Sequence, residues 1–141
     1  MGIWKKLFKD DATGPDYYRE GLELLRSGKY HEALTSFRLA LRDTPRDVAV
    51  LQQIAIAYTR IGMTEEAAKT YRTVLATDPD ASGAHYGLAF LLLRTGKRSD
   101  AEAHLRSFLA LAPDGQDAQK HVAHARETLT ELQNEAAGSE G

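Results

Sequence analysis

The sequence predicts an all-α fold built from three similar units, and two features carry this prediction. Pro45, Pro79 and Pro113 are spaced 34 residues apart, and the segment before each proline repeats one residue pattern. A period of this length is typical of solenoids, in which each unit packs only against its neighbours. Within each unit, apolar residues recur at the three- and four-residue spacing of two successive amphipathic helices. We therefore expect a stack of helical hairpins.

The second copy shows the first helix of each unit most clearly. Leu51, Ile54 and Tyr58 recur at the spacing of one helical face and predict its buried side. A glycine follows, and glycine adopts the left-handed conformation after a helix without a Cβ penalty. Because the other copies have the same glycine, we expect helix ends at Gly28, Gly62 and Gly96.

The second helix of each unit follows directly after the glycine. In the second copy, Ala67, Tyr71 and Val74 form its apolar stripe. In the third copy, Ser99 and Glu102 have the spacing of a capping box, which satisfies backbone amides at a helix start. The proline that closes each copy cannot donate to a helix and disfavours helical geometry in the residue before it.

Further columns coincide when the copies are aligned on their prolines: Arg26/Arg60/Arg94, Ala33/Ala67/Ala101, Leu41/Leu75/Leu109 and the small residues Gly21/Ala55/Ala89. The copies read YYREGLELLRSGKYHEALTSFRLALRDTP, LQQIAIAYTRIGMTEEAAKTYRTVLATDP and HYGLAFLLLRTGKRSDAEAHLRSFLALAP. On these residues the chain resembles the tetratricopeptide repeat family over about residues 15–113. Glu20, His85 and Leu105 depart from the apolar or aromatic residues usual in the family. The resemblance implies a right-handed α-solenoid of about seven helices.

The period also divides the chain into segments. We expect one domain at residues 15–134, with repeats at about 14–47, 48–81 and 82–115 and a capping helix at about 116–134. The capping helix is predicted from an apolar face formed by Ala118, Val122, Ala125, Leu129 and Leu132. Residues 135–141 hold small and charged residues without a stripe, so we expect disorder there. Residues 1–14 form a separate N-terminal segment.

Composition excludes several classes of function. The 141 residues include 18 basic and 20 acidic side chains, for a net charge of −2, without the concentrated basic face that nucleic acid requires. No cysteine is present, which rules out disulfides and thiolate metal sites. No stretch has the length of a membrane span and no secretory signal is visible, so we expect a cytoplasmic protein.

Catalysis and metal binding have little support in the sequence. No nucleophile, phosphate-binding loop or carboxylate pair occurs in a recognisable context. His121 and His124 share a helix face, but a metal site needs a third spaced ligand. We therefore expect a protein that is not an enzyme and has no cofactor or metal, with these two histidines in solvent.

The family resemblance implies a concave groove, lined by the first helices of the repeats, that holds a peptide or helix of a partner. The positions carried over are Tyr18, Leu22, Leu25, Gln52, Ile56, Thr59, Tyr86, Phe90 and Leu93. This lining is largely apolar, and an exposed apolar patch usually marks an interaction site. Relatives that clamp a terminal carboxylate use basic residues in a column that here holds Tyr18, Gln52 and Tyr86, so we exclude that mode. The alternative is that the capping helix or tight superhelical closure covers Leu22, Ile56 and Phe90.

Arg26, Arg60 and Arg94 fall in the last turn of the first helices, and we expect them at the rim of the groove. They either grip an acidic partner or complement the helix dipole, which favours a cation at this end. The dipole is the simpler explanation. We keep the arginines as rim residues that tune the preference of the groove for the charge of a partner.

The N-terminal segment, MGIWKKLFKDD, has an amphipathic pattern. Ile3, Trp4, Leu7 and Phe8 fall on one helical face and the lysines on the other. Three alternatives remain open: docking on the repeats of its own or a second copy, contact with another protein, or weak contact with the inner face of a membrane. We rank self-docking first, because an apolar segment and an apolar groove in one chain can cover each other.

The sequence therefore predicts a non-enzymatic adaptor or scaffold that binds a hydrophobic helix or peptide of a partner protein. Aromatic Tyr18, Tyr86 and Phe90 are the expected anchors. One alternative is a small chaperone that shields a hydrophobic client segment, as the resemblance to small three-repeat secretion chaperones implies. Another is a membrane-surface adaptor anchored by residues 1–14.

Overall fold

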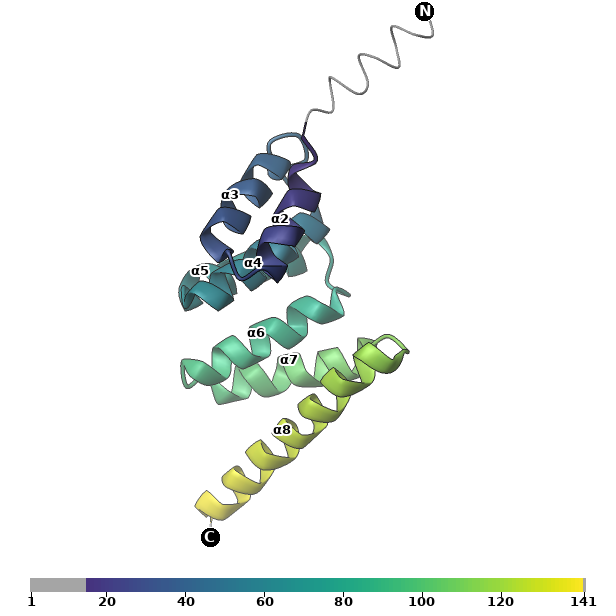
Figure 1. Ribbon diagram of the computed structural model, residues 1–141. Coiled ribbons are helices and arrows are strands. Elements are labelled where there is room, and N and C mark those ends of the chain that lie inside the picture. Colours follow the sequence, from purple (N-terminus) through teal and green to yellow (C-terminus); the bar gives the residue numbers. More distant parts are fainter. Residues whose placement is uncertain (1–14, 141) are drawn as a thin grey trace, which may run out of the picture.

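The computed structural model describes residues 15–140 and confirms the all-α prediction for this part of the chain. Its helices are α2 (Tyr17–Arg26), α3 (Tyr30–Leu41), α4 (Val48–Ile61), α5 (Thr64–Thr77), α6 (Ser82–Arg94), α7 (Arg98–Leu111) and α8 (Gln116–Glu140). They form the hairpins α2–α3, α4–α5 and α6–α7, which stack in chain order, with α8 after the last of them (Figure 1). The N-terminal docking segment, with Ile3, Trp4, Leu7 and Phe8, lies outside the described residues.

Each hairpin turns at its predicted glycine. Gly28, Gly62 and Gly96 have positive φ angles of 77°, 93° and 78°. In every repeat the amide of the residue after the glycine donates to a carbonyl in the last turn of the first helix. These bonds are all 2.9 Å long and run from Lys29 to Leu24, from Met63 to Tyr58 and from Lys97 to Leu92. They satisfy the helix end and direct the chain into the second helix.

The turn at Gly96 shows that one prediction, the capping box of Ser99 and Glu102, is wrong. The helix α7 begins at Arg98 with Lys97 as its N-cap, and no side chain caps it. Ser99 therefore lies inside the first turn, and the capping box predicted with Glu102 does not form. The amide of Lys97 is already bonded to Leu92, so the glycine turn fixes the helix start ahead of Ser99.

Small residues allow the two helices of a hairpin to pack closely. A Cβ at Gly21 on α2 would lie 2.5 Å from Cε1 of Phe37 on α3, and Phe37 is completely buried. Ala55 and Ala89 occupy the equivalent positions in the next hairpins and are also completely buried. One core cluster fills the first two hairpins and reaches α6 and α7, and a second joins α6 and α7 to α8.

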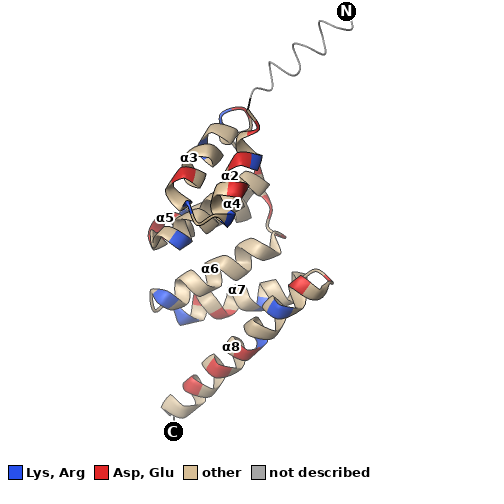
Figure 2. Cartoon of the chain, viewed as in Figure 1, with Lys and Arg blue, Asp and Glu red and all other residues tan. Residues whose placement is uncertain are grey.

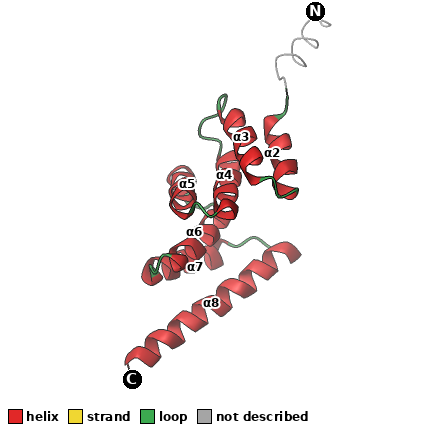
Figure 3. Cartoon of the chain, turned by 60° about the vertical axis from the view of Figure 1, so that its left-hand side comes forward, coloured by secondary structure: helices red, strands yellow, loops and turns green. Residues whose placement is uncertain are grey.

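The helix α8 caps the last hairpin through the predicted apolar face. Val122, Ala125 and Leu132 are buried in the second core cluster, and Leu129 packs against it. Figure 3 shows α8 extending past the ends of α6 and α7. Although α8 has 25 residues, no helix within residues 15–140 is both long and apolar enough to cross a membrane.

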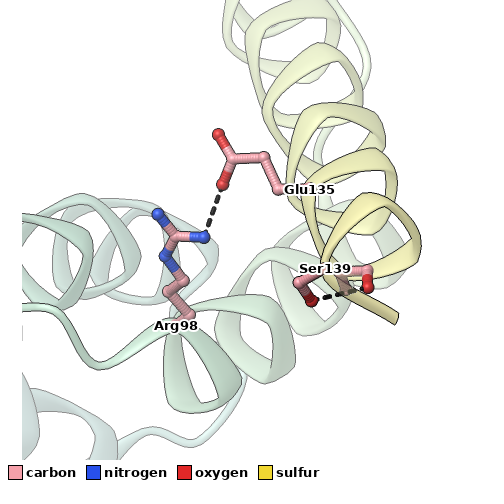
Figure 4. Close-up of polar contacts among 4 residues, drawn as sticks. Arg98, Glu135 and Ser139 are labelled. Carbon is pink, nitrogen blue, oxygen red and sulfur yellow. Dashed lines mark hydrogen bonds and ion pairs between the residues drawn. The ribbon is translucent and has the colours of Figure 1, made fainter. Parts of the chain in front are cut away.

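The end of α8 corrects the prediction of a disordered tail. Residues 135–140 continue the helix, and only residue 141 of the predicted tail lies outside the description. Glu135 pairs with Arg98 at the start of α7 over 2.6 Å (Figure 4). Both side chains are more than half exposed, so this pair contributes at most about 1 kcal/mol. Ala136 and Ala137 are strong helix formers, and their propensity extends the helix without an apolar stripe.

A histidine pair joins the two helices of the last hairpin. The Nδ1 atoms of His85 on α6 and His104 on α7 are 2.9 Å apart, and Nε2 of His85 is 2.8 Å from the carbonyl oxygen of Pro79. Because a carbonyl oxygen only accepts, Nε2 of His85 carries the proton and its Nδ1 accepts from His104. His85 stands where the family usually has an apolar residue, and both of its ring nitrogens thus have hydrogen-bond partners within the fold.

This pair predicts a loss of stability in acid. Burial, and next the neighbouring His85, lower the pKa of His104, while Asp100 raises it and Arg72 lowers it by smaller amounts. The unfolded chain binds a proton at about pH 6.5, where folded His104 still resists protonation. The free energy of unfolding should therefore fall as the pH drops below about 6.5. Urea unfolding at about pH 7.5 and about pH 5.5 measures this difference.

In His104→Gln the difference between the two pH values should shrink, because the titrating ring is absent. His31→Gln is the control, since His31 is exposed and forms no part of the pair, and it should keep the parent's difference. Equal pH dependence in the parent and in His104→Gln would contradict the assignment.

Candidate partner-binding groove

A cavity of about 690 Å³ lies between α4 and α6, the first helices of consecutive hairpins, with further walls from α5, α7 and α8. Its lining residues are Gln52, Ile56, Thr59 and Arg60 on α4, Tyr71 on α5, Gly83, Tyr86, Gly87, Phe90, Leu91 and Arg94 on α6, Phe108 on α7 and His121 on α8. We call this cavity the groove. Most of its lining is apolar, so it suits an apolar occupant.

The structure brings together the predicted groove residues of the second and third repeats, except Leu93. Those that line the groove are Gln52, Ile56, Thr59, Tyr86 and Phe90. Ile56 and Phe90 are both only half-buried. His124 of the capping helix stacks on Phe90, and apolar surface of both Ile56 and Phe90 remains accessible.

The predicted groove residues of the first repeat lie elsewhere. Tyr18, Leu22 and Leu25 on α2 are partly buried against the first core cluster, and Leu93 on α6 packs against both clusters. None of these four side chains lines the groove, and neither does Arg26. The cavity thus spans the second and third repeats, and the groove positions of the first repeat stay a prediction from the resemblance.

The helix α8 adds an aromatic wall that the sequence analysis missed. The ring of His124 stacks on Phe90, with ring centres 4.6 Å apart and an interplanar angle of 8°. Its Nδ1 is 2.7 Å from the hydroxyl of Tyr86, and His121 meets the same tyrosine ring edge-on at 4.8 Å. Both histidines keep exposed surface, as expected, but each also packs on a groove aromatic. Their three-residue spacing puts both rings on one side of α8, and this spacing was the sequence signal for a shared contact surface.

Two glycines of α6 shape the floor of the groove and were also missed. A Cβ at Gly87 would lie 2.5 Å from the hydroxyl oxygen of Tyr71, and a Cβ at Gly83 would lie 3.0 Å from the side-chain oxygen of Gln52. Both side chains reach α6 because glycine leaves them room. Burial raises the pKa of Tyr71 to about 12, with Thr59 as a smaller opposing influence, so this phenol stays protonated. The signal was the four-residue spacing of the glycines within one helix.

The charged residues of the groove are basic. Arg60 and Arg94, at the ends of α4 and α6, line it, and among residues 15–140 no aspartate or glutamate does. Burial also raises the pKa of Tyr86, which keeps its hydroxyl protonated beside His124. Within residues 15–140, no three histidine, cysteine or acidic side chains are grouped so that they could hold a metal ion.

Comparison with known proteins yields one family and a set of similar folds. The sequence matches the tetratricopeptide repeat family over residues 24–82 and, in an overlapping second match, over residues 62–124. No curated protein matches it significantly.

The similar solved structures include type III secretion translocator chaperones. SycD of Yersinia enterocolitica has a TM-score of 0.82 and 17% identity, and the match covers 91% of this chain and 88% of that one. SycD in complex with a peptide of the translocator YopD has a TM-score of 0.79 and 18% identity, over 85% and 92% of the two chains. PcrH, a Pseudomonas aeruginosa protein, in complex with the chaperone-binding region of PopD has a TM-score of 0.79 and 20% identity, over 90% and 96%. At these identities the likeness concerns the fold.

Proposed function

Because the chain belongs to the tetratricopeptide repeat family, we propose that it acts by holding an apolar segment of another protein in the groove between α4 and α6, and not by catalysis. The observation that carries this proposal is the groove itself, whose lining is largely apolar and keeps Ile56 and Phe90 accessible. Apolar surface in contact with water is unfavourable by about 25 cal/mol per Å². An apolar occupant removes that surface from water.

Tyr86 and Phe90 are the proposed anchors at the α8 end of the groove. Their ring centres are 4.8 Å apart, and Tyr86 also packs against Phe108 at 5.0 Å. Rings held in this way lose little freedom when a partner binds, which favours affinity. Tyr18, the third anchor expected from the sequence, does not line this cavity.

We favour a chaperone that shields one client segment over a general adaptor. Support comes from the solved structures of similar fold, of which one holds a peptide of the translocator YopD and another holds the chaperone-binding region of PopD. The size of the groove also supports it, since about 690 Å³ accommodates a short segment. An adaptor uses the same groove but holds two folded partners at once, whereas a chaperone keeps its client soluble on co-expression.

The test is a binding titration with groove variants. Ile56→Glu and Phe90→Glu each place a charge on the apolar lining, four residues before Arg60 or Arg94. Each should weaken binding by about tenfold or more, because the occupant loses apolar contact and the carboxylate, even when paired with the arginine, loses water. The probes are fluorescein-labelled peptides that carry Leu and Phe at varied spacings in an Ala/Ser background. Fluorescence anisotropy measures binding, and circular dichroism verifies that each variant is folded.

Leu111→Glu is the matched control, because Leu111 is 37% exposed at the end of α7 and lies outside the groove. This variant should bind like the parent. Groove variants that stay folded and bind like the parent, or a parent that binds none of the peptides, would contradict the proposal.

The emission of Trp4, the only tryptophan, tests self-docking in the same variants. Blue-shifted emission in buffer that moves to the red in Ile56→Glu would place the N-terminal docking segment in the groove of its own or a second copy. Red-shifted emission in both proteins would leave the groove free for another protein. A blue shift only on addition of anionic liposomes would support contact with a membrane.

A further inference from the structure

The two helices that form the groove have an unusual charge distribution. Apart from histidine, α4 carries a single charged side chain, Arg60, and α6 carries a single one, Arg94. Both lie in the last turn of their helix and both line the groove. The first helix of the first repeat, α2, instead mixes basic with acidic residues, including Glu20 and Glu23. Figure 2 shows this contrast between α2 and the uncharged length of α6.

The helix dipole accounts for only part of this distribution. A cation in the last turn is favourable at any helix end, and it explains the arginine column of all three repeats, Arg26 included. It does not explain why no acidic side chain of the part of the chain that the structure describes lines the groove. Among residues 15–140, neither Arg60 nor Arg94 forms an ion pair with a carboxylate. Their guanidinium groups are therefore available at the edge of an apolar surface.

A partner that fills the groove brings apolar surface against these guanidinium groups and removes water from them. A charge that loses water without gaining a partner is costly, whereas an arginine paired with a carboxylate forms short, strong hydrogen bonds. An occupant without an acidic group would thus bind against an electrostatic penalty. An occupant with one would gain from the same two residues.

We propose that the groove binds an apolar segment that carries a carboxylate, with Arg60 and Arg94 pairing the carboxylate while the apolar side chains pack against Ile56 and Phe90. This inference rests on the proposed function and adds the chemistry of the partner. This arrangement differs from the carboxylate clamp of the relatives. Their clamp uses basic residues in the column that holds Tyr18, Gln52 and Tyr86 in this chain. Here the basic residues lie in the last turns of α4 and α6, where they line the groove together with apolar side chains.

The test compares three versions of the tightest-binding peptide from the panel described above. One carries Glu next to its apolar residues and an amidated end, the second replaces this Glu with Gln, and the third has Gln with a free terminal carboxylate. The parent should bind the Glu peptide about tenfold more tightly than the Gln peptide, and this preference should decrease with added salt. Tighter binding of the third peptide than of the Glu peptide would assign the carboxylate to a chain end.

The protein variants test which residues pair with the carboxylate of the peptide. The double variant with Arg60→Gln and Arg94→Gln should lose the preference for Glu over Gln, while its affinity for the Gln peptide stays the same or improves. Arg26→Gln is the matched control, since it removes the same helix-end cation outside the groove. It should keep the preference in full.

The outcomes separate this inference from the proposed function. The parent could bind the Glu and Gln peptides equally while Ile56→Glu still weakens binding. That result would overturn the recognition of a carboxylate and would still support the groove as the binding site. A preference that survives in the double variant would overturn the role of the two arginines. Binding that is insensitive to Ile56→Glu in a folded protein would overturn the groove and the inference together.

Discussion

Replacing Gly21 with alanine is expected to lower the free energy of unfolding by about 1–2 kcal/mol, although alanine is the better helix former by about 1 kcal/mol. The added Cβ would lie 2.5 Å from Cε1 of Phe37, closer than two carbon atoms can approach. Because Phe37 is completely buried between the helices, its ring has no free space to move into. The cost of this overlap should therefore exceed the gain in helix propensity.

The third repeat indicates how to relieve the overlap. There Ala89 takes the place of Gly21 and Leu105 takes the place of Phe37, and both are completely buried in one cluster. Phe37→Leu alone should cost about 1 kcal/mol through the space that it leaves. In the double variant the alanine methyl occupies part of that space, so the two effects should be less than additive by about 0.5–3 kcal/mol.

Gly138→Ala is the control for helix propensity alone. No atom lies within 4 Å of a Cβ at this position, so the substitution should leave stability unchanged or raise it. Urea unfolding of the single and double variants, followed by circular dichroism, gives the coupling energy. Two outcomes would contradict this prediction: additive effects of Gly21→Ala and Phe37→Leu in the double variant, or a Gly21→Ala variant more stable than the parent. Either would show that the contact with Phe37 does not exclude a side chain at position 21.

The hairpins could be predicted because each depends on signals within a few residues. A positive φ at Gly28, Gly62 and Gly96 is a backbone requirement that glycine meets without strain, so the residue type reveals the turn. The repeat period then fixes which helices are neighbours, since each unit packs only against the next. The buried face of α8 could be predicted in the same way, from the periodic spacing of Val122, Ala125 and the apolar residues after them.

The extent of the groove could not be predicted, because it depends on what faces each apolar side chain across two repeats. Leu22 and Ile56 are equivalent in sequence, yet one packs against the core and the other lines the groove. On α6, Gly83 and Gly87 leave room for the side chains of Gln52 and Tyr71, which line the groove together with Ile56. The corresponding positions of α4, Ala49 and Gln53, carry side chains, so α4 does not leave the same room for side chains of its neighbours. A column of similar residues thus does not define a continuous surface.

The contacts of α8 were missed for a related reason. Its histidines are expected in solvent from the sequence, because two histidines without a third spaced ligand do not make a metal site. In the structure, His124 is exposed and still stacks on Phe90. A ring with a polar edge and a flat face can do both, because its nitrogen bonds to Tyr86 while its face covers an aromatic neighbour. Hydropathy alone does not reveal this behaviour.

The second large effect is expected for Val122→Asp, which places a carboxylate where α8 meets the last hairpin. Val122 is 7% exposed and shares a cluster with Leu105 and Phe108. Losing the apolar burial and burying a carboxyl group should together lower the free energy of unfolding by about 3–5 kcal/mol. This is a large part of the stability of a domain of this size, about 5–15 kcal/mol. Because repeats depend on nearest-neighbour contacts, α8 should detach before the first two hairpins unfold, which predicts an additional early step in urea unfolding.

Ala123→Asp is the matched control, since Ala123 is the next residue of α8 and is exposed. It introduces the same charge in the same turn and should cost only the difference in helix propensity, about 0.7 kcal/mol. Detachment of α8 also withdraws His124 from Phe90, so Val122→Asp should weaken peptide binding in the groove while Ala123→Asp should not. If both variants unfold in a single step at the parent's urea midpoint, the contact of α8 with α6 and α7 does not stabilise the last hairpin, and the groove does not depend on α8 for its aromatic wall.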